Sequence, residues 1–148
     1  LQYPTPLEDE DLGDLIDIAK SGNFSRYSSD YVLDLEKDLA KYYETNHSVT
    51  CSSGTAALHG CLVALDLPPG SEVVITPVAD IGVVLPIIYE NLIPVFGDLD
   101  PSTYNISLES IKSAVTKETK AIIAVHLGGN PADIINIKEF CEERKIFL

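Results

Sequence analysis

The spacing of apolar residues changes from helical to strand-like along the chain. In residues 8–21 and 30–44, apolar side chains recur every three or four positions among charged residues, which predicts two amphipathic helices. Ser28, Ser29 or Asp30 can cap the second helix. Farther along, short continuous apolar runs predict strands over residues 47–50, 72–76, 93–97, 120–127 and 145–148.

Helices are predicted between these strands, over residues 56–65, 81–89, 107–115 and 130–143. The helix at 56–65 is apolar nearly all round, so we expect it to be buried. The helix at 81–89 contains Gly82 and Pro86, which both oppose helix formation. We therefore expect a kinked helix there, capped by Asp80.

The predicted strands are apolar throughout instead of alternating, which is typical of strands covered on both faces. Strands and helices also alternate in order. Together these features predict an α/β fold of three layers, a mostly parallel sheet with helices on both faces. Ligands of such sheets bind at the carboxyl ends of the strands. That edge is predicted to carry the turn at Ser53 and residues 77–80, 98–100 and 126–130.

Composition narrows the class of protein. An apolar fraction of 45% over 148 residues supports one folded domain with a real core. A net charge of −13 opposes binding to nucleic acids or anionic membranes, and much of the excess falls in the first 45 residues. The scattered Cys51, Cys61 and Cys141 predict free thiols in a reducing compartment. No signal peptide or membrane span is visible, so we expect a cytoplasmic location.

The turn at residues 51–58 is the strongest candidate for a binding site. Here a β-prone run breaks at small residues and a helical pattern begins. The first N–H groups of a helix have no intrahelical partners and carry partial positive charge, so Ser53, Gly54 and Thr55 can receive a phosphate group. A plain helix cap explains the same residues, since the spacing matches neither a Walker loop nor a dinucleotide fingerprint.

Several other polar residues can be explained by either a functional or a structural role. His126 ends an apolar strand on the ligand side, where it either contacts a substrate or cofactor or serves a structural role. His47 and His59 are predicted to be structural. Asp98 and Asp100 are better explained as the start of a turn, and Asp80 as a helix cap, than as acid–base groups. No nucleophile elbow, HExxH sequence or paired cysteine ligands occur in the chain.

Ordered sequence blocks around the turn carry a family resemblance. They lie within residues 32–42, 53–58, 69–74, 93–96, 98–105 and 119–129. The set resembles the DegT/DnrJ-type sugar aminotransferases, a branch of the fold-type I pyridoxal phosphate enzymes. The resemblance covers nearly the whole chain. It implies that residues 1–45 form an N-terminal helical segment and residues 46–148 the amino-terminal part of the large, cofactor-binding domain.

The resemblance also implies a cofactor site. In that family the turn holds the phosphate of pyridoxal phosphate, here through Gly54 and Thr55 with Ser53 adjoining. His126 is expected to join the same site. Relatives have an aromatic residue after the second strand to stack on the cofactor ring, whereas this chain has Val78-Ala79-Asp80-Ile81, so we expect Ile81 to pack on the ring face instead.

The resemblance predicts no catalytic residue within this chain. The Asp that holds the pyridine nitrogen should follow the strand at 145–148, and the Schiff-base lysine should come later still. The lysines present fall on helices, helix ends or the starts of strands. We therefore expect the chain to be part of a longer homodimeric aminotransferase that acts on a nucleotide-linked keto-sugar or a cyclitol ketone, with Glu or Gln as amino donor. A sugar dehydratase of the same family and a noncatalytic protein that keeps the fold are the alternatives.

Overall fold

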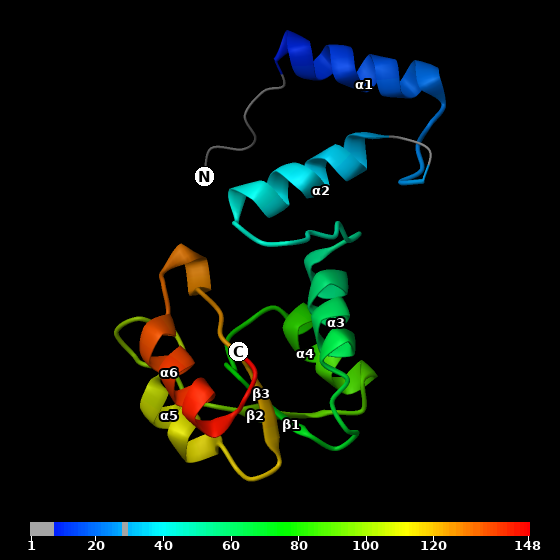
Figure 1. Ribbon diagram of the computed structural model, residues 1–148. Helices are drawn as coiled ribbons and strands as arrows, with labels where there is room; N and C mark the ends of the chain where they lie inside the picture. The colour runs from blue at the N-terminus through cyan, green and yellow to red at the C-terminus, as the bar shows by residue number, and fades with distance from the viewer. Residues whose placement is uncertain (1–7, 28–29) are drawn as a thin grey trace. The chain divides into compact units, whose positions relative to one another are not determined.

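The computed structural model describes residues 8–27 and 30–148 (Figure 1). The chain forms two compact units, residues 1–50 and 51–148. The first contains helices α1 (Asp9–Ser21) and α2 (Asp30–Tyr42), which confirms both predicted amphipathic helices. A capping box formed by Glu8 and Asp11 begins α1, and Gly22, with a φ of 67°, ends it. Ser28 and Ser29, the other candidate caps of α2, lie outside the described residues.

The predicted strand at 47–50 is wrong, since the structure has no strand in this segment. The backbone of this segment bonds to a side chain of α2 instead of to a neighbouring strand. Glu36 of α2 is buried, and its carboxylate accepts the Thr50 N–H at 2.8 Å and the Thr50 hydroxyl at 3.0 Å. Arg26 contacts the same carboxylate at 3.0 Å. The hydrogen bond from the Thr50 backbone, opposed in part by burial, lowers the pKa of Glu36.

The second unit alternates helices and strands in the predicted order. Its elements are α3 (Gly54–Leu65), β1 (Glu72–Ile75), α4 (Ile81–Tyr89), β2 (Ile93–Phe96), α5 (Leu108–Ala114), β3 (Thr119–Ile123), the 3₁₀ turn η1 (Leu127–Gly129) and α6 (Ile134–Arg144). None of the described helices is long and apolar enough to cross a membrane.

The sheet is parallel, with strand order β2-β1-β3. Beyond β3, Phe147 forms a further parallel bridge to Ala121, as expected for a strand that starts near residue 145. Each connection between two successive strands therefore returns the chain from the carboxyl end of the sheet to its amino end. This places the carboxyl ends of the strands, Ile75, Phe96 and Ile123, along a single edge.

Alternate residues of the strands face two separate cores. On one face, Val73 and Ile75 of β1 and Ala121 of β3 pack with residues of α3 and α4, including Leu62 and Ile87. On the opposite face, Val74 of β1 and Ile122 of β3 form a core with α5 and α6, through Ile111, Ile137, Phe140 and Cys141. Helices thus cover both faces of a parallel sheet, which confirms the predicted three-layer α/β fold (Figure 1).

Three details differ from the sequence prediction. Strand β3 ends at Ile123, four residues early, and α6 begins at Ile134 because a turn with left-handed Gly128 and Gly129 occupies the connection. Helix α3 is not buried all round: within it only Leu62 is fully buried, and Val63 is 52% exposed. Helix α4 does form with Pro86 inside it, and Asp80 caps it as predicted.

Candidate functional site

The turn that starts α3 has the geometry of an open helix N-terminus. Ser53 is extended (φ −164°, ψ 164°), and its hydroxyl accepts the N–H of Ala56 at 3.1 Å. Its carbonyl accepts the N–H of Ala57 at 3.0 Å. The N–H groups of Gly54 and Thr55 lie in the first turn, where a helix supplies no carbonyl partner. A plain helix cap therefore accounts for Ser53. The N–H groups of Gly54 and Thr55 remain as two donors at the positive end of a twelve-residue helix.

The first turn of α4 lies directly against Thr55. A Cβ added to Gly82 would be 2.8 Å from Asp80 Oδ1 and would overlap the Thr55 hydroxyl oxygen. Asp80 in turn caps α4 by accepting the Gly82 N–H at 2.7 Å. Gly82, which opposes helix formation, thus makes room for Thr55 because it has no Cβ. The beginnings of α3 and α4 meet at this point, beside the carboxyl end of β1.

Ile81 is the first residue of α4, and its side chain is 63% exposed. It follows the β1 strand at the edge where ligands of parallel sheets bind. This exposed aliphatic side chain provides an apolar surface beside the N-termini of two helices. Ile81 is therefore placed at the edge predicted from the sequence, while its contact with a ring remains a prediction.

His126 lies in the loop after β3 and not at the strand end. Its Nδ1 accepts the backbone N–H of Ala132 at 2.9 Å. Because a backbone N–H can only donate, the neutral ring carries its proton on Nε2. His126 is exposed, so the structural hydrogen bond on Nδ1 leaves Nε2–H as a donor at the surface. The two readings of His126 are compatible.

Asn105 is a feature of this edge that the sequence analysis missed. It is 3% exposed, and its side chain joins the loop after β2 to the loop after β3. Its partners are more than twenty residues away in the sequence, so no local pattern reveals them. Asp100, in contrast, behaves as predicted: it starts a turn by accepting the Ser102 N–H at 2.7 Å, and the hydrogen bonds from Ser102 lower the pKa of Asp100.

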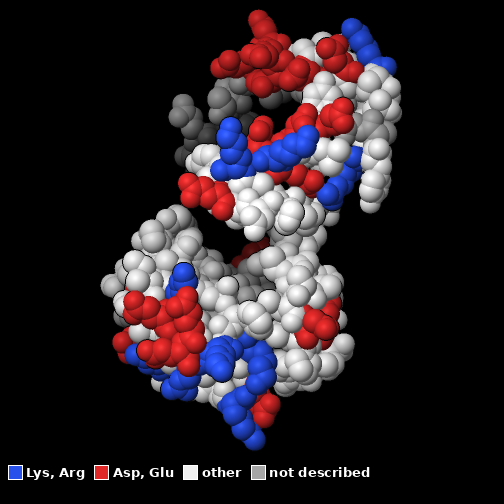
Figure 2. Space-filling view, viewed as in Figure 1, with Lys and Arg blue, Asp and Glu red and all other residues white. Residues whose placement is uncertain are grey.

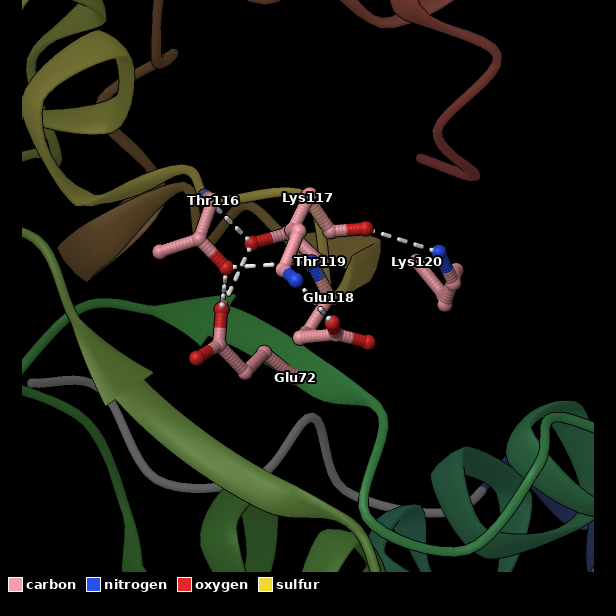
Figure 3. A network of polar contacts seen from close by, with 6 residues as sticks. All are labelled: Glu72, Thr116, Lys117, Glu118, Thr119 and Lys120. Atoms are coloured by element: carbon pink, nitrogen blue, oxygen red, sulfur yellow. Dashed lines mark hydrogen bonds and ion pairs between the residues drawn. The ribbon is translucent and has the colours of Figure 1, made fainter.

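The opposite, amino edge of the sheet carries the other prominent polar cluster. Figure 3 shows Glu72 with one carboxylate oxygen facing the hydroxyls of Thr116 and Thr119, at 2.5 and 3.0 Å. A cavity of about 390 Å³ lies at this edge, and its lining includes four cations: Lys117, Lys120, Arg144 and Lys145. Lys and Arg side chains gather on the lower part of this unit in Figure 2.

Of the two other histidines, His59 has a side-chain partner in the structure. His59 contacts Glu90 at 2.6 Å between Nε2 and Oε1, which joins α3 to the end of α4 and fits the structural role predicted for it. Within residues 8–27 and 30–148, no group of three His, Cys, Asp or Glu side chains is placed to hold a metal ion.

Comparison with known proteins identifies the family. The model of the DegT/DnrJ/EryC1/StrS aminotransferase family matches residues 6–148. GDP-perosamine synthase of Vibrio cholerae is 31% identical over 118 residues, which are 80% of this chain and 32% of that protein.

Solved structures agree in fold and in family. The aminotransferase from Psychrobacter cryohalolentis has a TM-score of 0.91 and 27% identity, over 99% of this chain and 37% of its own. The GDP-4-keto-6-deoxy-D-mannose-3-dehydratase of E. coli, with bound hydrated PLP, has a TM-score of 0.88 and 30% identity, over 97% of this chain and 38% of its own. The chain thus spans about a third of the length of these relatives. Because the family model matches residues 6–148 and the fold agrees, the chain belongs to the DegT/DnrJ/EryC1/StrS aminotransferase family.

Proposed function

We propose that residues 46–148 are the amino-terminal part of the large domain of a pyridoxal phosphate-dependent aminotransferase, with residues 1–45 as an N-terminal helical segment. The substrate is a keto-sugar, linked to a nucleotide, or a cyclitol ketone. The observation that carries the proposal is the open N-terminus of α3, packed against Gly82 at the carboxyl edge of the sheet.

The residues present fit the cofactor's phosphate. The N–H groups of Gly54 and Thr55 and the Thr55 hydroxyl are hydrogen-bond donors at a positive helix end, which favours a dianion. No atom lies within 4 Å of where a Cβ on Gly54 would stand, so a ligand can approach that backbone closely. Ser53 supports this arrangement by capping α3, which fixes the direction of the outward N–H groups.

Ile81 and His126 complete the proposed grip on the cofactor. Ile81 packs its exposed aliphatic side chain on the ring face, in place of the aromatic residue expected from relatives. His126 offers Nε2–H as a donor to an oxygen of the cofactor or substrate. Pyridoxal phosphate itself supplies the electron sink for transfer of an amino group. The residues of this chain bind and orient the cofactor.

The covalent part of the site lies outside this chain. Within residues 51–148, no lysine is at the carboxyl edge in the proposed arrangement: Lys120 lies in β3, near its amino end, and Lys145 follows α6 at the same edge. The parent protein supplies the lysine that holds the cofactor, takes Glu or Gln as amino donor, and acts as a homodimer in the cytoplasm.

A dehydratase is the second candidate, because one of the similar structures is a GDP-4-keto-6-deoxy-D-mannose-3-dehydratase. The proposed phosphate grip at Gly54 and Thr55 serves both reactions equally, since each uses the same cofactor phosphate. The residue at the cofactor-lysine position discriminates them: a lysine supports the aminotransferase and a histidine the dehydratase.

The test uses the full-length parent protein, purified and mixed with pyridoxal phosphate. The aminotransferase proposal predicts a visible absorbance band that borohydride reduces, leaving the cofactor covalently attached, and transfer of nitrogen from Glu or Gln to a keto-sugar. Cofactor binding without covalent attachment supports the dehydratase. No binding at all would leave a noncatalytic protein that keeps the fold.

A further inference from the structure

Two asparagines fasten together loops that are distant in the sequence. The Asn105 Nδ2 donates to the Asn130 carbonyl at 2.9 Å, and the Asn105 Oδ1 accepts the Leu127 N–H at 3.0 Å. In return, the Asn130 Nδ2 donates to the carbonyl of Thr103 at 3.1 Å. We call Asn105 and Asn130 the asparagine clasp. It holds both ends of the turn at residues 127–130 against the loop that follows β2.

The two contacts of Asn105 need a donor and an acceptor on one side chain, and an amide supplies both. The Leu127 N–H requires an acceptor and the Asn130 carbonyl requires a donor, so the orientation of the amide is fixed by its partners. Because Asn105 is 3% exposed, water has little access to replace either bond. An aspartate of the same shape would keep the acceptor but set a carboxylate oxygen against the Asn130 carbonyl.

His126 immediately precedes the turn that the asparagine clasp holds. Gly128 and Gly129 have left-handed φ values of 61° and 84°, and the turn's own backbone bonds are short-range, from the Gly129 and Asn130 N–H groups to the His126 and Leu127 carbonyls. The clasp fixes Leu127, the residue after His126, and the Ala132 N–H fixes the His126 ring on the far side of the turn. The backbone next to His126 and the His126 ring are therefore both fixed, and together they set the direction of Nε2–H.

We propose that Asn105 is a positioning residue, which acts through the 127–130 turn to hold the His126 ring with Nε2–H available to an oxygen of the bound ligand. The role of that donor rests on the proposed function. The hydrogen-bonded link between Asn105 and the turn stands on the structure alone.

The experiment compares Asn105→Asp with Asn91→Asp in the full-length protein. Both change one amide into a carboxylate, but Asn91 is exposed in the turn between α4 and β2. Hydrogen–deuterium exchange of the segment 124–132 is expected to be about tenfold faster in Asn105→Asp, as for loss of a buried hydrogen bond, and unchanged in Asn91→Asp. Asn130→Ala, at an exposed position, gives a smaller increase and serves if Asn105→Asp does not fold.

Pyridoxal phosphate affinity, measured in a double-mutant cycle, tests the route through His126. Asn105→Asp is expected to weaken binding about threefold to tenfold when His126 is present and to have no further effect in His126→Ala, since coupled residues are not additive. Unchanged exchange would overturn the clasp. Equal losses of affinity in both backgrounds would overturn the positioning role. Failure of the unsubstituted protein to bind the cofactor would instead overturn the proposed function and, with it, the ligand role of His126.

Discussion

At the amino edge of the sheet, the Glu72 carboxylate accepts the hydroxyls of Thr116 and Thr119, and Lys120 donates to the carbonyl of Lys117 at 3.0 Å (Figure 3). At the carboxyl edge, the N–H groups of Gly54 and Thr55 point out of a helix end. Both edges are rich in polar groups. The amino-edge groups drawn in Figure 3 bind one another, whereas the site proposed at the carboxyl edge keeps the Gly54 and Thr55 N–H groups for a ligand.

Charge alone would have suggested the opposite assignment. The amino edge holds four cations around its cavity. The donors proposed to bind phosphate at the carboxyl edge are uncharged: two backbone N–H groups and one hydroxyl. Lysine side chains are mobile and strongly hydrated, while N–H groups in the first turn of a helix are fixed in direction by the fold. On the proposed assignment, preorganised donors identify the anion site better than the number of positive charges does.

Thr55→Ala is expected to have the largest effect on binding. It removes a hydroxyl donor to a dianion, a contact worth about 1.5–3 kcal/mol, so the affinity for pyridoxal phosphate should fall about tenfold to a hundredfold. Binding of pyridoxal, which has no phosphate, should change little. Titration of the full-length protein with both compounds measures the difference. Equal losses for the two compounds would place the phosphate elsewhere.

Glu72→Ala tests the amino edge. Removing the carboxylate leaves the Thr116 and Thr119 hydroxyls without their acceptor, which should lower the free energy of unfolding by about 1–2 kcal/mol. The affinity for pyridoxal phosphate should stay the same. Urea denaturation and cofactor titration check the two halves of this prediction. A loss of affinity at unchanged stability would show that the amino edge, and not the carboxyl edge, holds the ligand.

Gly82→Ala and Gly60→Ala separate the contact with Thr55 from general helix effects. A Cβ on Gly82 overlaps the Thr55 hydroxyl, so that side chain must move, whereas a Cβ on Gly60 in α3 meets no atom within 4 Å. We expect Gly82→Ala to weaken pyridoxal phosphate binding about threefold to tenfold, and Gly60→Ala to leave affinity unchanged while adding up to about 1 kcal/mol of stability. Similar affinities in both variants would show that Thr55 does not depend on Gly82.

Asp100→Asn should have the smallest effect, and only at pH values at which Asp100 is ionised. Hydrogen bonds from Ser102 lower the pKa of Asp100 from 3.8, its unfolded value, so its stabilising contribution is present above that value and is lost as the pH falls through the folded pKa. The variant should be slightly less stable than the unsubstituted protein at pH 7, and the two should converge in acid. Urea midpoints across this range provide the measurement. A gap that widens in acid would contradict the assignment.

Local patterns predicted most of the fold because each element carries its own signals. Asp80 caps its helix as expected, with a side chain that accepts the N–H group of Gly82, and Ser107 accepts the N–H group of Ser110 in the same way. The strand predicted at 47–50 failed because Thr50 gives its N–H to Glu36, a partner fourteen residues away. A β-prone run becomes a strand only when a neighbouring strand takes its hydrogen bonds.

The candidate site was predicted only where its chemistry is local. Ser53, Gly54 and Thr55 are consecutive, so a helix start was recognisable in the sequence. Gly82 was expected only to oppose the helix, and no local pattern singled out Asn105, because the partners that explain them, Thr55 and residues 127–130, are reached only through the folded sheet. Side chains that support a site through distant contacts have no spacing rule of their own.

The most direct test of the central claim is a crystal structure of the full-length protein with pyridoxal phosphate. Phosphate oxygens are expected within about 3 Å of the Gly54 and Thr55 nitrogens, at the start of α3. A phosphate bound at the amino edge, among Lys117, Lys120, Arg144 and Lys145, would contradict the claim.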